Sequence, residues 1–373
     1  MKIFVSAGET SGDIHAAALV SEIKLIDPSI HFFGVGSEAL KKVGVNVVED
    51  ISPKGSIGLL EALPNIFSIY KVFSKIKRLI REEKPDAVLL VDSQGFNLPL
   101  AKYAKSLGIK TIYYIPPQEW LWGTKKGIQK VAQYLDLVLA IFKKEEEAYK
   151  EAGAETLYFG HPLPEIIAEE IAQDGGGVSE NSRTILVCPG SRTHEVKTLF
   201  PIFLEACKIL HDKNKNLKFK VLIASSWIES LLRHMAEELS DLKIEFIREG
   251  KYKEMKGSSF IIATSGTINL EASIIGTPNI MVYKLSPLTY WIGKNILKID
   301  KKLQFFSMPN ILLKRKFIPE LIQKEATPEN IVREVEVSLQ KGEILDNMEL
   351  VMLLGDSKPL EKLARGVVDF LRR

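Results

Sequence analysis

At 373 residues, the chain exceeds the usual size of a single hydrophobic core, which predicts two domains of roughly 150 to 200 residues each. An apolar share of 46% with 26% charged residues is typical of a soluble globular protein and excludes the disordered and fibrous classes. Fifty basic against forty-seven acidic residues leave a net charge of +3, so the totals do not indicate a general nucleic-acid-binding surface.

The cysteines and the hydrophobic pattern indicate the compartment. Cys188 and Cys207 have neither the spacing of a metal site nor that of a disulfide framework, which fits a reducing cytosol. The first residues form a strand-like segment without the features of a signal peptide, so we do not expect export. The longest apolar candidate, residues 258–282, is broken by polar residues and glycines, and we expect no segment that spans a bilayer.

Short β-branched runs alternate with amphipathic segments along the chain, which predicts parallel sheets covered by helices. The expected strands of a first series lie near 2–6, 30–34, 45–48, 86–91, 110–114, 136–141 and 156–159, and those of a second series near 184–188, 219–223, 243–247, 260–263 and 279–283.

The stretch "AQDGGGVSENSR" separates the two series and predicts a linker at residues 172–183, because three consecutive glycines sustain neither helix nor strand. Residues 1–171 then form an N-terminal Rossmann-like domain, and residues 184–345 form a C-terminal one. A helical segment, residues 346–373, ends the chain. The predicted class is α/β, with two doubly wound domains facing a cleft, and ligands of such sheets bind beyond the carboxyl ends of the strands.

The first strand is followed by "SAGETSGDIH" at residues 6–15, where small and hydroxylated residues surround two glycines. An ordinary tight turn, a phosphate-binding turn and one lip of a ligand cleft all fit this stretch. The next strand runs into "FFGVGSEAL" at residues 32–40, a weak likeness of the dinucleotide fingerprint that follows the second strand rather than the first. A dinucleotide-dependent oxidoreductase is therefore a minor alternative, and the absence of a G-x-x-x-x-G-K-[ST] string disfavours a P-loop NTPase.

Residues 56–83 form an apolar segment that becomes basic and amphipathic toward its end. The ordinary interpretation is a helix packed on the core with solvated lysines, and the alternative is a helix resting on a membrane surface. The basic clusters "KIDKK" at 298–302 and "KRK" at 314–316 fit anionic headgroups but do not decide between the two.

"PDAVLLVDSQGFN" places Asp92 at the carboxyl end of a strongly apolar strand, where a carboxylate is well placed to act as a general base or, alternatively, to cap the next helix. One strand later, "YYIPPQEWLWGTKK" puts Trp120 and Trp122 in a loop. Their aromatic faces either line an apolar or sugar pocket or pack beneath the loop.

In the second series, "TILVCPGSRTHEV" places Gly190, Ser191 and Arg192 between a strand and a helix expected to begin near Glu195. A guanidinium and free backbone N–H groups at a helix start suit a diphosphate, although a tight turn with a solvent-facing arginine gives the same pattern.

"FIIATSGTINLEASIIGTP" adds a second turn, in which Ser265, Gly266 and Thr267 open a helix that contains Glu271. The N–H groups there would bind an anion and Glu271 would accept hydrogen bonds from a ribose, or Ser265 or Thr267 simply caps the helix. Two such turns in one domain favour a nucleotide diphosphate, and no cluster of metal ligands accompanies them in the sequence.

Together the motifs resemble the lipid-A-disaccharide synthases, inverting glycosyltransferases with two Rossmann-like domains of the GT-B type. The matching strings are "AGETSGDIH", "VDSQGFN", "PPQEWLW", "GHPL", "PGSR", "SGTINLEA" and "MPNILL", in the family's order over nearly the whole chain. The resemblance implies that UDP-2,3-diacylglucosamine is joined to 2,3-diacylglucosamine 1-phosphate, which releases UDP and forms the β-1′,6-linked disaccharide of lipid A. It implies no obligatory metal or other cofactor.

The resemblance also implies roles for individual residues. Asp92 corresponds to the family's essential aspartate, expected to take the proton of the acceptor 6-hydroxyl, and Arg192 to the arginine that meets the departing diphosphate. The expected donor-binding residues are Gly190, Ser191, Ser265, Gly266, Thr267, Glu271 and Asn310. The expected acceptor-side residues are Gly8, Glu9, Ser11, Gly12, Asp13, Trp120 and Trp122, which favours the cleft-lip interpretation of the first turn.

Three positions depart from the family's pattern. Gly95 stands where a second acid is usual, Gly123 where an arginine is expected, and "KKE" at 143–145 where P-F-E is usual. These changes concern acceptor contacts and acyl-chain specificity, and they leave the donor turns unaffected.

Several alternatives therefore stay open: a UDP-sugar enzyme with another lipid acceptor, a UDP-sugar epimerase, and a non-catalytic nucleotide-sugar-binding homologue. Under the main hypothesis we expect a cytoplasmic protein bound peripherally to the inner face of the inner membrane through the basic helix around residues 71–81. No nucleic-acid partner is expected.

Overall fold

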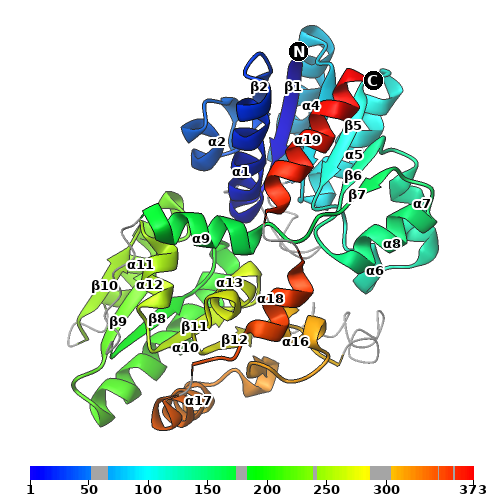
Figure 1. Ribbon diagram of the computed structural model, residues 1–373. Coiled ribbons are helices and arrows are strands. Elements are labelled where there is room, and N and C mark those ends of the chain that lie inside the picture. Colours follow the sequence, from blue (N-terminus) through cyan, green and yellow to red (C-terminus); the bar gives the residue numbers. More distant parts are fainter. Residues whose placement is uncertain (52–65, 174–182, 238–241, 286–303, 343, 356–357) are drawn as a thin grey trace. The chain divides into compact units, whose positions relative to one another are not determined.

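The computed structural model describes residues 1–51, 66–173, 183–237, 242–285, 304–342, 344–355 and 358–373. These residues divide into two compact units: unit 1 comprises Met1–Glu165 and Leu354–Arg373, and unit 2 comprises Ile166–Leu353 (Figure 1). Most of the linker expected at 172–183 lies outside the described residues.

Unit 1 is built on a parallel sheet of seven strands in the order β3-β2-β1-β4-β5-β6-β7. The strands are β1 (Lys2–Ala7), β2 (His31–Val35), β3 (Asn46–Glu49), β4 (Ala87–Val91), β5 (Lys110–Tyr114), β6 (Leu137–Leu139) and β7 (Thr156–Leu157). The helices are α1 (Thr10–Ile26), α2 (Glu38–Lys42), α4 (Ile66–Glu83), α5 (Gln94–Ser106), α6 (Glu119–Trp122), α7 (Lys125–Ala132), α8 (Lys143–Glu151), α9 (Leu163–Gln173), which continues into unit 2, and α19 (Pro359–Arg372). The predicted first series of strands is confirmed.

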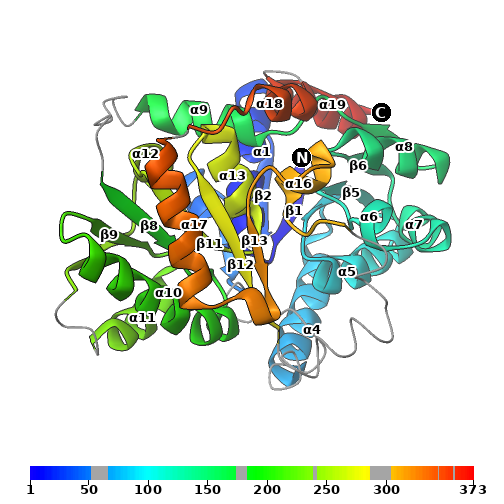
Figure 2. The same ribbon diagram turned by 90° about the horizontal axis from the view of Figure 1, so that it is seen from below.

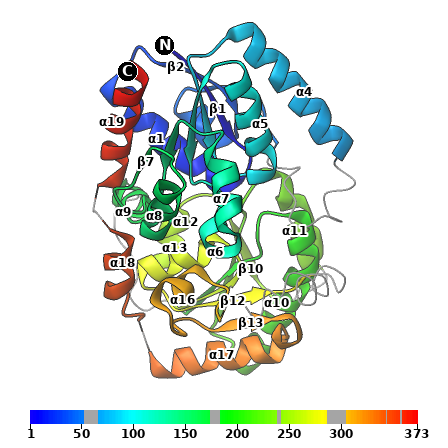
Figure 3. The same ribbon diagram turned by 90° about the vertical axis from the view of Figure 1, so that its right-hand side faces the viewer.

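Helix α4 contains the basic end of the amphipathic segment. Val72, Ile76 and Ile80 are buried on its inner face, and α4 packs beside α5 (Figure 3). The described part of this helix packs on the core, as the ordinary interpretation expects, and contact of its exposed basic face with a membrane stays a prediction. Residues 56–65 of the predicted segment lie outside the described residues. Among the described helices, none is both long and apolar enough to cross a bilayer.

The C-terminal helix α19 belongs to unit 1, where it lies along α1 (Figure 1). Its buried residues Leu360, Leu363, Ala364, Val367 and Leu371 recur at helical spacing and form one apolar face. Residues 346–373 were predicted to form a separate helical segment, because a packing partner more than 300 residues away leaves no local signal.

Unit 2 has a second parallel sheet, in the order β10-β9-β8-β11-β12-β13. Its strands are β8 (Thr184–Cys188), β9 (Lys218–Leu222), β10 (Ile244–Ile247), β11 (Phe260–Thr264), β12 (Asn279–Tyr283) and β13 (Glu320–Ile322). Its helices are α10 (Thr193–Lys213), α11 (Glu229–Ala236), α12 (Lys251–Lys256), α13 (Thr267–Ile275), α16 (Met308–Leu313), α17 (Pro328–Lys341) and α18 (Met348–Leu354), with short 3₁₀ turns at Ser226–Ile228 and Gln323–Glu325. The predicted second series is confirmed, and the three-residue edge strand β13 was not predicted.

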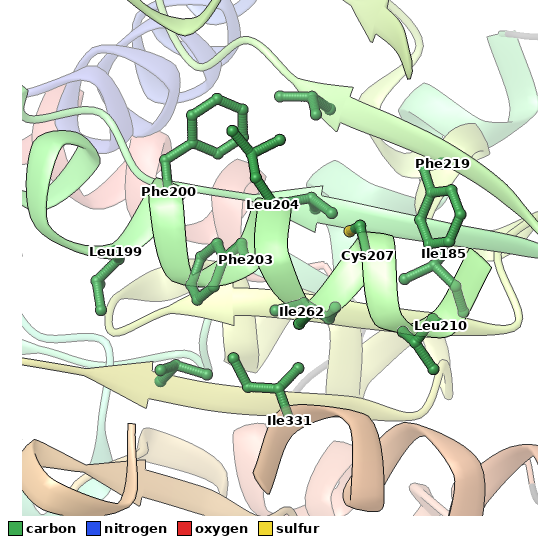
Figure 4. Packing of buried hydrophobic residues seen from close by; sticks show 14 of the residues in the cluster. Ile185, Leu199, Phe200, Phe203, Leu204, Cys207, Leu210, Phe219, Ile262 and Ile331 are labelled. Atoms are coloured by element: carbon green, nitrogen blue, oxygen red, sulfur yellow. The ribbon is translucent and has the colours of Figure 1, made fainter. Parts of the chain in front are cut away.

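The core of unit 2 forms where α10 and α17 pack against the sheet (Figure 2). Phe200, Phe203 and Leu204 of α10 are buried against sheet residues such as Ile262 (Figure 4). Large apolar side chains at helical spacing on one face of α10 thus meet strands that are apolar on both faces.

We expect Phe203→Ala to destabilise unit 2 by about 3 to 5 kcal/mol, because a fully buried ring would be replaced by a cavity. Denaturant unfolding followed by circular dichroism measures the change. Met352→Ala is the control in the same unit, because the Met352 side chain is 74% exposed, and a comparable loss in that variant would contradict the prediction.

Candidate functional site

In unit 1, the turns that follow β1 and β4 lie side by side, because these strands pair in parallel with Ala7 opposite Val91. A Cβ added to Gly8 would lie 2.7 Å from the Ser93 hydroxyl oxygen, so a side chain at Gly8 would displace the second turn. A Cβ on Gly12 would lie 3.6 Å from the Asp92 Cβ. The predicted residues Gly8, Gly12 and Asp92 therefore come together at the carboxyl edge of this sheet.

The backbone at Asp92 is held in a strained conformation. Asp92 has φ of +51° and Ser93 has φ of +47°, a left-handed geometry that non-glycine residues rarely adopt. The Asp92 N–H donates to the Tyr114 carbonyl at 3.1 Å. Its own carbonyl accepts from the Tyr113 hydroxyl at 2.7 Å and from the Asn97 amide at 2.9 Å. These bonds fix the main chain, and the half-buried carboxylate projects from a rigid turn.

Asn97 joins this turn to the neighbouring strand. Its side chain is fully buried, and its Nδ2 also donates to the carbonyls of Val91 at 2.9 Å and Ser6 at 3.2 Å. The Ser6 hydroxyl donates to the Asn97 Oδ1 at 2.6 Å. Asn97 was not among the predicted site residues, although the asparagine five positions after Asp92 was part of a recognised motif.

Asn97→Ala is expected to lower the free energy of unfolding of unit 1 by about 2 to 4 kcal/mol, because several buried polar groups would lose their hydrogen-bond partner. Thermal and denaturant unfolding test this. Gln94→Ala, which removes an exposed amide from the same turn, should change stability by less than about 0.5 kcal/mol. Equal effects of the two substitutions would show that the hydrogen bonds of Asn97 do not stabilise this turn.

Asp13 was expected to contact the acceptor substrate, but its carboxylate has partners within unit 1. Its carboxylate is buried and accepts from the N–H groups of Ser37 at 2.7 Å and Ala39 at 2.8 Å, so it caps the start of α2. Burial raises the pKa of Asp13 and outweighs the opposing effect of these hydrogen bonds. We therefore assign Asp13 to the structure of the first turn, whereas Glu9 and Ser11 are half-buried at the start of α1.

The same contacts explain the dinucleotide-like string. A Cβ on Gly34 would lie 1.9 Å from the Val5 carbonyl oxygen, and one on Gly36 would lie 2.4 Å from the Leu40 side chain. Both glycines are thus required by packing, and Asp13 already binds N–H groups at the helix start that a pyrophosphate would need. The geometry disfavours the oxidoreductase alternative.

Trp120 is half-buried in α6 and makes two specific contacts. Its Nε1 donates to the Glu145 carboxyl at 3.3 Å, and its ring lies 5.7 Å from that of Phe142. Phe142 in turn lies 5.0 Å from His161, whose Nδ1 accepts from the Leu163 N–H. Burial holds the pKa of His161 well below its usual range, so His161 is a neutral packing residue. The Trp122 side chain lies outside the described residues.

Gly123 and Gly95, the two glycines that depart from the family's pattern, differ in how closely other atoms surround them. A Cβ on Gly123 would lie 1.8 Å from the Glu119 Oε2 and 2.9 Å from the Glu119 carbonyl oxygen, so a larger residue there would force the Glu119 side chain and the local backbone to shift. The Gln94 amide donates to the other Glu119 oxygen at 3.1 Å, which connects α6 to the start of α5. Apart from its chain neighbours and its own helical backbone, no atom of the described residues lies within 4 Å of a Cβ built on Gly95, and packing does not explain that departure.

In unit 2, the turns after β8 and β11 are neighbours, since Cys188 pairs with Ala263. Gly190 has φ of +103°, and a Cβ there would lie 3.0 Å from the Thr264 side chain. Gly266 has φ of +147°, is exposed, and precedes α13 without any side-chain cap. Ser265 is half-buried and Thr267 is exposed beside it. The start of α13 therefore presents backbone N–H groups suited to an anion.

Arg192 lies at the N-cap position of α10, with Ser191 half-buried before it. Its guanidinium is half-buried and donates to the Glu195 carboxylate at 3.0 Å. Glu195 is itself buried, and a Cβ on Gly190 would lie 2.9 Å from its Oε2. The predicted turn residues Gly190, Ser191 and Arg192 thus lie together between β8 and α10, with the Arg192 guanidinium held by Glu195.

Glu271 and Asn310 have partners within unit 2, and their expected contact with the donor stays a prediction. The buried Glu271 carboxylate pairs with the Lys251 ammonium at 2.5 Å and accepts from the Tyr252 hydroxyl at 3.3 Å. Lys251 and Tyr252, which begin α12, were not predicted because nothing near them in sequence marks them as partners of Glu271.

The fully buried amide of Asn310 is used entirely within unit 2. Its Nδ2 donates to the Ile318 carbonyl at 3.0 Å and to Glu320 at 2.9 Å, and its Oδ1 accepts from the N–H groups of Phe317 and Ile318. These four bonds fill the hydrogen-bonding capacity of the side chain, so Asn310 fixes the chain around α16. Within the described ranges, no group of three or more His, Cys, Asp and Glu side chains has an arrangement that could hold a metal ion.

The sequence is similar to a known protein family over nearly its whole length. A family model described as lipid-A-disaccharide synthetase matches residues 3–354. The lipid-A-disaccharide synthase of Geobacter metallireducens is 35% identical over 339 residues, which cover 90% of this chain and 86% of that one. That of Persephonella marina is 38% identical over 343 residues (89% and 88%), and that of Gloeothece citriformis is 31% identical over 387 residues (100% of both).

Solved structures share the fold at low sequence identity. The S. aureus MnaA–UDP complex has a TM-score of 0.69 and 15% identity, covering 100% of this chain and 97% of that one. UDP-GlcNAc 2-epimerase from Neisseria meningitidis bound to UDP-GlcNAc has a TM-score of 0.65 and 14% identity, covering 100% of both chains. The predicted α/β class with two Rossmann-like units of the GT-B type is confirmed.

Proposed function

The chain belongs to the lipid-A-disaccharide synthetase family, and from that premise we propose that Asp92 and Arg192 serve glycosyl transfer from UDP-2,3-diacylglucosamine to 2,3-diacylglucosamine 1-phosphate. The enzyme is a glycosyltransferase that forms the lipid A disaccharide, and it uses a nucleotide-sugar donor and a lipid acceptor. The identities of the two acylated substrates and the roles of individual residues belong to the proposal.

The Asp92 turn is the observation that supports the proposal most. A carboxylate on a rigid, strained turn is suited to act as a general base. In the proposed step, Asp92 takes the proton of the acceptor 6-hydroxyl while that oxygen attacks the anomeric carbon of the donor. The bond from that carbon to the diphosphate breaks on the opposite face, and UDP leaves with the electron pair. The configuration at the anomeric carbon is inverted.

We assign the donor side to the two adjacent turns of unit 2. The Arg192 guanidinium and the N–H groups at the start of α13 would stabilise the negative charge that grows on the departing diphosphate. Ser191, Ser265 and Thr267 supply hydroxyl groups beside them. Glu271 and Asn310 act behind this surface, because their polar groups already bind within the unit.

We assign the acceptor side of the enzyme to Gly8, Glu9, Ser11, Gly12, Asp92 and Trp120. Gly8 and Gly12 let the first turn approach the Asp92 turn closely, and an aromatic ring is suited to a sugar face or an acyl chain. Helix α4 would then meet the inner-membrane surface through its basic face, since Val72, Ile76 and Ile80 occupy the opposite, buried face. Lysines and arginines on such a face favour anionic headgroups.

We expect Asp92→Asn to lower the rate of disaccharide formation by about 10² to 10⁴, because the amide cannot accept the acceptor's proton. UDP release and the lipid product are followed together in detergent with both acylated substrates, and donor affinity is measured separately by calorimetry. Donor affinity should stay within about twofold of the parent chain.

Asp86→Asn is the control for this experiment, because the exposed Asp86 binds the Lys2 N–H at the opposite end of the sheet. Normal disaccharide formation by Asp92→Asn would remove Asp92 as the base. UDP release without disaccharide in the parent chain would indicate hydrolysis or a different acceptor.

Arg192→Ala is expected to reduce kcat/KM for the donor by about 10²- to 10³-fold, because one charged donor to the leaving group is lost. Arg233→Ala is the matched control, since that guanidinium pairs with Glu229 on α11 at 2.7 Å just as Arg192 pairs with Glu195. If both variants retained the parent kcat/KM, the assignment of the donor turn would be wrong.

A further inference from the structure

A buried carboxyl group lies next to the acceptor side and has no role in the step above. Glu145 is 0% exposed at the start of α8. The Ile141 N–H donates to its Oε2 at 2.8 Å, and the Trp120 ring donates to its Oε1 at 3.3 Å. Glu145 is therefore the polar group that fixes the orientation of the Trp120 indole.

Glu145 also lies within electrostatic reach of Asp92. Burial, with a smaller contribution from the charge of Asp92, raises the pKa of Glu145 to about 8 against the lowering effect of its hydrogen bonds. The order of neighbouring strands β4, β5 and β6 explains the proximity, because Asp92, Trp120 and Glu145 follow these strands in turn at the same edge.

The charged and titratable groups around Glu145 come from several elements. Asp92 follows β4, Glu119 precedes Trp120 on α6, and Tyr149 lies one turn along α8. His161 lies beyond Phe142 and is neutral. The lysines of α8, Lys143 and Lys150, pair with Glu146 instead.

We propose that Glu145 is a positioning residue for the acceptor side: its protonated carboxyl group holds the Trp120 ring without adding a second negative charge beside Asp92. The inference rests on the proposed roles of Asp92 and Trp120. Loss of the Glu145 proton would place a second, buried negative charge next to the Asp92 carboxylate, which raises the cost of keeping Asp92 ionised. Acceptor use should therefore fall as the pH rises through the titration of Glu145.

The first test is the pH dependence of kcat/KM for the acceptor. If the protonated form alone is competent, the parent enzyme loses about tenfold between pH 7 and pH 9, and Glu145→Gln, which cannot ionise, loses less than about twofold. Glu147→Gln, an exposed neighbour on the same helix, should keep the parent ratio. Glu145→Leu should raise the acceptor KM about fivefold at pH 7 with the donor KM unchanged, since one hydrogen bond to Trp120 is lost.

The second test follows the titration of Glu145 without measuring enzyme activity. In a chain with Trp122, Trp227 and Trp291 replaced by Phe, Trp120 is the remaining tryptophan. Its emission should titrate near pH 8, and the transition should vanish when Glu145→Gln is added. An emission that does not titrate, or a Glu145→Gln enzyme with the parent's pH dependence, would overturn the proposal. A fully active Asp92→Asn enzyme would instead overturn the function on which it rests.

Discussion

The buried amide of Asn97 is the interaction on which the reactive edge of unit 1 depends. It binds the carbonyls of Ser6, Val91 and Asp92, which lie at the ends of two adjacent strands. Left-handed backbone at two successive non-glycine residues is costly, and it persists only where surrounding bonds over-determine it. With the main chain held in this way, the Asp92 carboxylate projects from a preorganised turn, which suits the general-base role proposed for it.

Unit 2 reaches a preorganised edge by a different route. Its turns depend on Gly190 and Gly266, whose positive φ values permit backbone that other residues would strain. Behind them, Glu195 orients Arg192, and Lys251 holds Glu271. Separating either ion pair would leave a buried charge without its partner, which is costly. The two carboxylates therefore hold Arg192 and Lys251 in fixed positions. A leaving diphosphate would meet a surface whose donors are already aligned.

Local patterns predicted much of this architecture, and long-range partners account for what they missed. The alternation of apolar runs and amphipathic segments located the strands of both series, and the turn residues after β1, β4, β8 and β11 were found because ligand-binding turns follow strand ends. The partners of Asp13, Glu271 and Asn310 lie elsewhere in the chain, so their side chains read as available when they are in fact bound. The docking of α19 on α1 was hidden for the same reason.

Four carboxyl groups near the carboxyl edges of the two sheets differ in burial and in hydrogen-bond partners, and these differences indicate different roles. Asp13 is satisfied by backbone N–H groups, and Glu271 by a lysine and a tyrosine, so both are structural. Glu145 is as deeply buried, and among the described residues it accepts from the Trp120 ring and the Ile141 N–H but pairs with no cation, so burial favours its neutral form. Asp92 is half-buried, with bonds that fix its backbone. Asp92 thus combines a rigid backbone with partial exposure, which suits the proton transfer proposed for it, and a neutral Glu145 adds no second charge beside it.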